Sequence, residues 1–256
     1  MNPIVAACFL GQPFPTSTPA PNSPWHFTRL TKGEHLYHAG DDFRGLFQVM
    51  RGSFKTLSST CSGMEQVLDF HILGDFMGMD AISVGEYPST AIALEESEAC
   101  SISYAALSAL CAIHTDVQNN LDIAMSRQIR RKTKIITLLA HTSAAERVVM
   151  FLLDLLNRTA TADRETDVLA LPMKHCDIAS FLGMSAETLS RQFVKLQRLG
   201  VVRPHVNGVQ ICSAALECFK GSIYDCGFSL AEATRKEKGP GIRGMSSLHP
   251  TFASCS

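Results

Sequence analysis

The sequence predicts an α+β fold with an all-β N-terminal domain, a long helix and a C-terminal winged helix-turn-helix domain. Three patterns predict it. Glycines recur about every 11 residues between Gly40 and Gly85, which is typical of many short strands in a sandwich or barrel. A repeat with 4-3 spacing follows over residues 117–138, as in a long helix. Residues 176–212 then carry the signals of two short helices, a glycine turn between them and a hairpin.

The N-terminal part divides into an arm and a β domain. Residues 1–24 are rich in Pro, Ser and Thr and have no apolar period, so we expect a disordered arm. Strand-like runs then lie between the glycines. They are Leu46–Met50, Ser53–Ser58 and Gln66–Ile72. We therefore expect residues 25–113 to form a β roll.

The chain from Tyr104 to His141 is expected to form a short helix and then a long one. Residues along the long helix step alternately by 4 and 3, which is the spacing of a coiled-coil seam. The seam residues are Val117, Leu121, Ala124, Gln128, Arg131, Ile135 and Leu138. Two interpretations are open. Residues 114–142 form a dimerisation helix, or the helix packs on its own β domain.

Residues 176–200 predict a helix-turn-helix. Gly183 suits the left-handed position just after a first helix at Asp177–Leu182. Ser185 is a good N-cap for a second helix, Ala186–Leu199, which stops at Gly200. The apolar residues of the second helix fall on one inward face. They are Leu189, Phe193 and Leu196.

A polar trio, Glu187, Ser190 and Arg191, shares another face near the start of the second helix. The major groove admits one helix, and the first turns of that helix reach base edges. Arg can donate to O6 and N7 of guanine, Glu can accept from the amino group of cytosine, and Ser can bond a neighbouring base. The alternative for Glu187 and Arg191 is an ordinary i, i+4 surface salt bridge.

The segment Val201–Cys212 predicts the wing. Asn207-Gly208 between two apolar runs is a strong two-residue hairpin signal. A wing lies along the phosphate backbone, where contacts position the protein without specifying sequence. Candidate phosphate contacts are Lys195, Arg198, Arg203 and His205.

The rest of the C-terminal region completes this domain. Ser143 is expected to cap an amphipathic helix over residues 144–159, and Val168–Met173 to form a short strand. We expect residues 143–220 to be the winged helix-turn-helix domain. Residues 221–256 lack a core pattern and are expected to be a mobile tail.

Composition narrows the class of protein. The 256 residues are 46% hydrophobic and 18% charged, as in an ordinary globular protein. The net charge of −1 means that DNA binding must come from local patches. Apolar runs are too short to span a membrane. Nine cysteines without a CxxC pair suit a reducing cytoplasm. The sequence contains no nucleophile–base pattern, so we do not expect an enzyme.

The segment GMSAETLSRQFVKLQRLGVV closely resembles the recognition segment of the CRP/FNR bacterial transcription regulators. The trio Glu187, Ser190 and Arg191 resembles the FNR and FixK branch, which reads TTGAT-type half-sites. The resemblance extends upstream to about Trp25, where LFQVMRGSFK and FHILGDFMGMDAI resemble the sensor jelly roll of the family, a cyclic-nucleotide-binding-like domain. It implies a cytoplasmic homodimer that binds double-stranded DNA, recruits RNA polymerase and mostly activates transcription.

The family's cofactors are not expected here. Its oxygen-sensing members hold a [4Fe–4S] cluster through three N-terminal cysteines and one in the β domain, whereas this chain offers Cys8 and Cys100. Its nucleotide-binding members use a Gly-Glu pair and an Arg on the phosphate. Here Asp75 follows Gly74, and Pro88 stands at the Arg position.

Two rival classes remain open. One is a thiol-based redox-sensing regulator of the same fold, in which modification of Cys176 blocks DNA binding. The other is a β-roll protein or enzyme that binds a small ligand or a metal. A metal at His35 and His38 is not expected, because we expect their spacing on a strand to put the rings on opposite faces.

Overall fold

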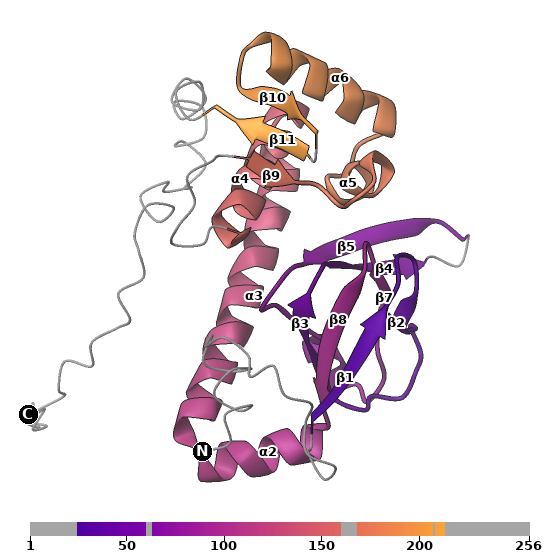
Figure 1. Ribbon diagram of the computed structural model, residues 1–256, viewed down its shortest axis with the longest axis vertical. Coiled ribbons are helices and arrows are strands. Elements are labelled where there is room, and N and C mark those ends of the chain that lie inside the picture. Colours follow the sequence, from indigo (N-terminus) through magenta and orange to yellow (C-terminus); the bar gives the residue numbers. More distant parts are fainter. Residues whose placement is uncertain (1–24, 60–62, 160–167, 207, 213–256) are drawn as a thin grey trace, which may run out of the picture.

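The computed structural model describes residues 25–59, 63–159, 168–206 and 208–212. The expected arm and tail, Cys8 and Asn207 lie outside these residues. Within them, a β roll is followed by helices and then by a winged helix-turn-helix, as the sequence predicted (Figure 1).

The β roll consists of two four-stranded antiparallel sheets. In sheet order, the first contains β1 (Trp25–Leu30), β8 (Ser97–Ile102), β3 (Leu46–Arg51) and β6 (Phe76–Met77). The second contains β2 (His35–Tyr37), β7 (Thr90–Ala93), β4 (Phe54–Ser59) and β5 (Glu65–His71). A short 3-10 helix, η1 (Met79–Ser83), follows β6. The three expected strand runs match β3, β4 and β5, with ends shifted by about one residue, which is within the usual scatter of such boundaries.

Apolar side chains fill the space between the sheets. Val49, Phe54, Met77 and Ala99 belong to one buried cluster and are almost fully enclosed. Such burial stabilises the roll through the hydrophobic effect, at roughly 25 cal/mol for each Å² of apolar surface removed from water.

Two helices, α2 (Tyr104–Ile113) and α3 (Thr115–His141), connect the roll to the C-terminal domain, which begins with α4 (Ala144–Thr159). The predicted cap at Ser143 is confirmed. The backbone N–H of Ser143 donates to Oε2 of Glu146 at 2.7 Å, and the backbone N–H of Glu146 donates to Oγ of Ser143 at 3.4 Å. This reciprocal capping box fixes the start of α4.

The winged helix-turn-helix contains α5 (His175–Phe181), α6 (Ala186–Arg198) and a sheet in the order β10 (Val202–His205), β11 (Gly208–Ile211), β9 (Val168–Ala170). The turn has the predicted chemistry, because Gly183 has φ of 61° and Oγ of Ser185 accepts from the backbone N–H of Thr188 at 3.1 Å. Strand β9 is shorter than predicted. Pro172, two residues after it, has no N–H to extend the ladder.

Gly208 is required in the wing. Its φ is 154°, and a Cβ there would lie 2.0 Å from the carbonyl oxygen of Leu169 on β9. The glycine therefore allows β11 to approach β9 closely, which the hairpin signal alone did not indicate.

The roll and the winged helix-turn-helix share a hydrophobic cluster. Phe70 of β5 contacts Phe151 of α4 and Phe181 of α5, with ring centroids 5.8 and 5.2 Å apart, and Phe151 and Phe181 lie 5.7 Å apart. Val67 and Ile72 of β5 belong to the same cluster. Figure 1 shows β5 running beside α5, on the side away from α6. Strand β5 thus joins the two domains.

Among the described residues, none of the helices has the length and apolar character needed to cross a membrane.

Candidate DNA-binding interface

The start of α6 presents the predicted polar trio to solvent. The side chains of Glu187 and Arg191 are 74% and 73% exposed, and Ser190 is exposed as well. The opposite face of α6 is buried in the domain core. Its residues are Leu189, Phe193 and Leu196. The helix is therefore fixed by one face and offers the other, which is the arrangement a major groove requires.

The i, i+4 salt bridge that was the alternative interpretation is also formed. Nη2 of Arg191 lies 2.6 Å from Oε1 of Glu187. Pairs this exposed contribute about 0–1 kcal/mol, so exchanging the pair for base edges costs little. The salt bridge and base reading are compatible.

The predicted phosphate contacts are exposed on α6 and on the wing. Lys195 and Arg198 are exposed toward the C-terminal end of α6, and Arg203 and His205 are exposed on β10.

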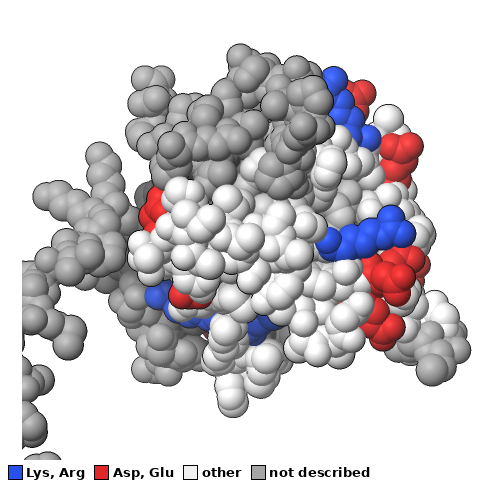
Figure 2. Space-filling model, turned by 90° about the horizontal axis from the view of Figure 1, so that it is seen from below, with Lys and Arg blue, Asp and Glu red and all other residues white. Residues whose placement is uncertain are grey.

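The molecule seen from below, at the α2 end, shows mostly uncharged residues (Figure 2). Helix α2 itself contains no Asp, Glu, Lys or Arg. Its exposed surface therefore offers no cation for DNA phosphate, in contrast to α6 and β10.

Cys176 is exposed in the first turn of α5. It lies outside α6 and its polar trio. Modification there remains a hypothesis, which the exposure of the thiol permits.

The predicted dimer seam faces the chain's own core, which corrects the first interpretation of α3. Its residues pack into two buried clusters or contact the roll. They are Val117, Leu121, Ala124, Ile135 and Leu138 in the clusters, and Gln128 and Arg131 at the roll. Gln128 donates to the carbonyl oxygen of Phe76 at 3.0 Å, and Arg131 donates to Asp69 at 2.6 Å. This face of α3 therefore agrees with the alternative interpretation, in which the helix packs on its own β domain.

A second 4-3 repeat runs along the opposite side of α3, and we call it the outer seam. Ile129 and Ile136 are its large apolar members and are 65% and 68% exposed. All eight positions are exposed: Thr115, Asn119, Asp122, Ser126, Ile129, Thr133, Ile136 and Ala140. Two exposed isoleucines seven residues apart are typical of an unpartnered coiled-coil face.

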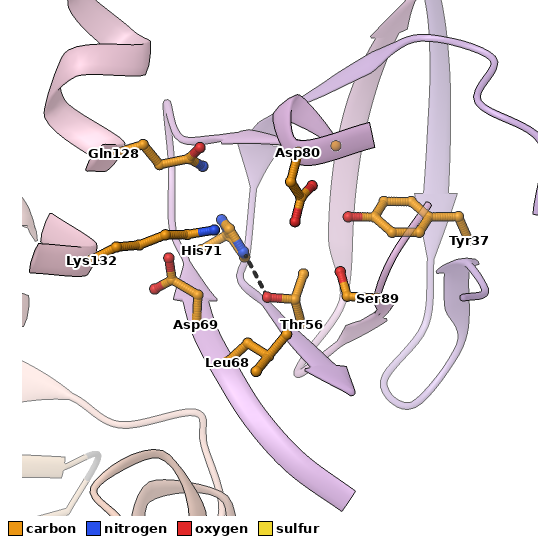
Figure 3. A pocket seen from close by; sticks show the side chains of 10 residues that line it. Tyr37, Thr56, Leu68, Asp69, His71, Asp80, Ser89, Gln128 and Lys132 are labelled. Carbon is orange, nitrogen blue, oxygen red and sulfur yellow. Dashed lines mark hydrogen bonds between the residues drawn. The ribbon is translucent and has the colours of Figure 1, made fainter. Parts of the chain in front are cut away.

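A small polar pocket lies between the roll and α3 (Figure 3). Tyr37, Asp80 and Ser89 line one side, and Gln128 and Lys132 reach in from α3. Its cavity of about 20 Å³ has room for a single water molecule. Arg is absent from the residues that line it. The pocket therefore offers neither the volume nor the bidentate cation that a nucleotide phosphate requires.

Asp75, which stands where the family's nucleotide-binding members have the Glu of their Gly-Glu pair, has another role. Its carboxylate pairs with Arg158 of α4 and lies 3.6 Å from Arg131 of α3. It thus connects the roll to both helices and is not among the pocket residues.

Of the two candidate iron–sulfur ligands, Cys8 and Cys100, the structure describes Cys100 alone. Cys100 is 1% exposed and packs with Trp25, Leu46 and Ile102 in a hydrophobic cluster. A cluster ligand needs several thiolates around one open site. Among the described residues, no group of three His, Cys, Asp or Glu side chains could hold a metal ion.

The histidine pair departs from expectation. The rings of His35 and His38 lie on the same side, with centroids 4.3 Å apart and the two Nδ1 atoms 3.0 Å apart. The pairing of β2 with β7 shifts register between His35 and Tyr37, so simple alternation along the strand fails there.

His71 of β5 is buried beside the pocket, where its Nε2 lies 3.2 Å from Oγ1 of Thr56 (Figure 3). Burial lowers the pKa of His71, and the charges of Arg131 and Arg158 act in the same direction, although Asp69 and Asp75 oppose them. Burial alone would raise the pKa of Asp69, but the neighbouring His71 and the guanidinium groups of Arg131 and Arg158 hold it below its usual value. Burial thus favours the neutral imidazole of His71, next to the carboxylate of Asp69, which accepts a hydrogen bond from Arg131.

We expect this arrangement to make the protein sensitive to acid. Below the ordinary His pKa of 6.5 the unfolded chain binds a proton that the folded state does not, so stability falls as pH falls, by up to about 1.4 kcal/mol per pH unit. Urea unfolding at about pH 7.5 and 5.5 measures the loss, which His71→Gln should reduce. If the wild type and His71→Gln lose equal stability between these pH values, the loss comes from titratable groups other than His71.

Comparison with known proteins gives consistent matches. The sequence model for the cyclic nucleotide-binding domain matches residues 27–114, and that for the Crp-like helix-turn-helix domain matches residues 146–216. The chain is 33% identical over 189 residues to the transcriptional activator protein FnrA of Stutzerimonas stutzeri, covering 74% of this chain and 78% of that protein.

Two further similarities agree with this. The fumarate and nitrate reduction regulatory protein of Escherichia coli K12 is 34% identical over 173 residues, which are 68% of this chain and 69% of that protein. The structure of FixK2 from Bradyrhizobium japonicum superposes with a TM-score of 0.67 at 24% identity, covering 77% of this chain and 96% of that one. The FixK2 likeness supports the fold.

Proposed function

The chain belongs to the CRP/FNR family of DNA-binding transcription regulators, and from this premise we propose that it is a homodimeric activator that reads TTGAT-type palindromes. The observation that carries the proposal is the exposed trio Glu187, Ser190 and Arg191 on a helix whose other face is buried. Its relatives named as activators support the direction of regulation.

The trio suits the half-site chemically. A TTGAT half-site contains one G·C pair. Arg191 donates to O6 and N7 of the guanine, Glu187 accepts from N4 of the paired cytosine, and Ser190 contacts a neighbouring base. Because Glu187 and Arg191 already lie together, one base pair can engage both side chains.

The outer seam of α3 is the proposed dimer contact. Pairing Ile129 and Ile136 with a second copy buries two side chains that are otherwise exposed. A two-fold axis there relates two α6 helices, which must enter major grooves about 34 Å apart.

The remaining assignments follow from DNA binding. Lys195, Arg198 and Arg203 contact phosphate and contribute affinity without sequence preference. The protein acts in the cytoplasm, where its DNA lies, and recruits RNA polymerase. Residues 25–113 form the sensor domain, 114–142 the dimerisation helix and 143–220 the DNA-binding domain.

The protein carries no iron–sulfur cluster and no cyclic nucleotide. The buried position of Cys100 and the water-sized pocket support this part of the proposal. The exposed thiol of Cys176 favours a second candidate, a redox-sensing regulator of the same fold. Loss of oxidant sensitivity in Cys176→Ser would support that candidate, and retained sensitivity would remove it.

Fluorescence anisotropy with short duplexes tests the proposal. At about 0.15 M salt the chain should bind a TTGAT palindrome roughly 10³-fold or more tighter than a scrambled duplex. Equal affinity for the two duplexes would contradict sequence-specific binding to this site. Ultraviolet–visible absorbance of anaerobically purified protein checks the cofactor assignment, since a cluster would give a visible band.

A further inference from the structure

The β4–β5 hairpin of the roll contacts α5, the helix that precedes α6. Nζ of Lys55 on β4 lies 2.7 Å from Oδ1 of Asp177 on α5. The backbone N–H of Val67 on β5 donates to Oγ of Ser180 at 3.0 Å, and Nε2 of Gln66 donates to the carbonyl oxygen of Ser180 at 2.5 Å. These partners are more than 100 residues apart in sequence.

The contact closes a sheet edge. Strand β5 is the last strand of its sheet, so one row of its backbone groups lacks a neighbouring strand. Ser180 satisfies the N–H of Val67 on that edge. An edge strand covered by a helix is protected from pairing with other chains. Here the covering helix belongs to the DNA-binding domain.

The ion pair depends on docking. The side chains of Lys55 and Asp177 are only 15% and 11% exposed. Taking one buried charge away leaves the other uncompensated, which is strongly unfavourable. At a boundary between domains the remaining charge can instead recover water if the boundary opens. The pair therefore favours one docked arrangement and penalises intermediate ones.

The docked arrangement leaves α6 available. In Figure 1, α5 lies between β5 and α6, so the hairpin contacts the side of the domain away from the recognition helix. Glu187 and Arg191 keep more than two thirds of their side-chain surface exposed. The contact thus constrains where α6 points without covering it.

We propose that the Lys55–Asp177 pair, with the Ser180 contacts, is a positioning contact that sets the direction of α6 relative to the dimer axis. A dimer gains from its second half-site only if both recognition helices point into grooves with one separation. Loss of the contact lets each DNA-binding domain rotate. Palindrome affinity then falls while half-site affinity stays the same, and the selectivity for half-site spacing declines.

The test measures spacing selectivity of the full-length chain. The operator is one that the wild-type chain selects from random duplexes, so the test does not depend on the TTGAT assignment. Lys55→Met should weaken binding to this operator about tenfold, within the 5- to 150-fold range of typical coupling between sites. It should also reduce the loss caused by lengthening the spacer by about two base pairs. Affinity for a single half-site should not change.

Further variants separate positioning from misfolding. Lys55→Arg keeps the charge and should restore spacing selectivity, whereas Asp177→Asn should reproduce the effect of Lys55→Met. The matched control is Arg29→Met, which breaks the exposed pair with Glu98 on the roll and should change nothing. Ser180→Ala perturbs only one hydrogen bond and provides a milder variant if Lys55→Met does not fold.

Three results would overturn the proposal. One is unchanged operator affinity and unchanged spacer dependence in Lys55→Met, Asp177→Asn and Ser180→Ala, which would make the contact a passive part of the fold. A second is tighter operator binding by Lys55→Met, which would make the contact an inhibitory one. Loss of half-site affinity in parallel with operator affinity would also contradict a positioning role.

Discussion

Replacing Arg191 with alanine should weaken binding to the TTGAT palindrome by about 1–3 kcal/mol per half-site, because the variant loses the paired donors to guanine O6 and N7. Both subunits carry the change, so the complete operator loses about twice that amount. Binding to scrambled duplex should be almost unaffected. The measurement is a gel-shift or anisotropy titration on both duplexes.

The base that Arg191 reads can be identified with altered operators. For the wild-type chain, replacing the G·C pair by A·T should cost about 1–3 kcal/mol per half-site. For Arg191→Ala the same replacement should cost less than it costs the wild type, because only the contact between Glu187 and N4 of the cytosine is then lost. If the variant still discriminates at that pair as well as the wild type does, Arg191 does not read it.

Arg198→Ala is the matched control on the same helix. Arg198 is exposed toward the far end of α6, where we expect a phosphate contact. Its loss should weaken binding to all duplexes alike and reduce the salt dependence of binding by about one counterion per subunit. A sequence-dependent loss in this variant would move the reading surface further along α6.

Local signals were sufficient to predict the geometry of the helix-turn-helix. The Gly183 turn, the Ser185 cap and the inward face of α6 depend on residues within a few positions of one another, and the structure has each of them as expected. Such features follow from backbone chemistry and helical period, which the sequence states directly. The roles of Glu187, Ser190 and Arg191 on DNA stay predictions.

The long-range features were not predictable in the same way. Helix α3 carries two 4-3 repeats, and the repeat that is apolar at both ends and polar in the middle is the one that the sequence offers as a dimer seam. Period alone cannot say which repeat packs on the roll. The repeat that packs on the roll is the one whose polar residues find partners there. Arg131 donates to Asp69 and Gln128 donates to the carbonyl oxygen of Phe76, and both partners are far away in sequence. The Lys55–Asp177 pair could not be predicted from local patterns either, because its two residues lie far apart in sequence.

Charging the outer seam should separate the subunits. With glutamate at both Ile129 and Ile136, four carboxylates would face one another across a two-fold axis, in place of four isoleucines. We expect sedimentation to show monomers. We also expect the variant to lose most of the affinity that the second half-site adds, which is roughly 10²- to 10⁴-fold when two binding modules are linked. Half-site affinity should be retained, because neither residue contacts the α6 domain core.

The choice of Ile129 and Ile136 matters for what this experiment decides. Leu121 belongs to the other 4-3 repeat, whose residues pack on the roll, and its side chain is only 7% exposed. A charge there would be placed in a buried hydrophobic cluster, so it would disturb folding as well as assembly. Ile113→Glu is the matched control, since Ile113 is 75% exposed on α2 and lies outside the outer seam. An intact dimer in Ile129→Glu/Ile136→Glu, or dissociation caused equally by Ile113→Glu, would place the subunit contact elsewhere. The geometry that α6 needs on a palindrome would then have to come from a different two-fold axis.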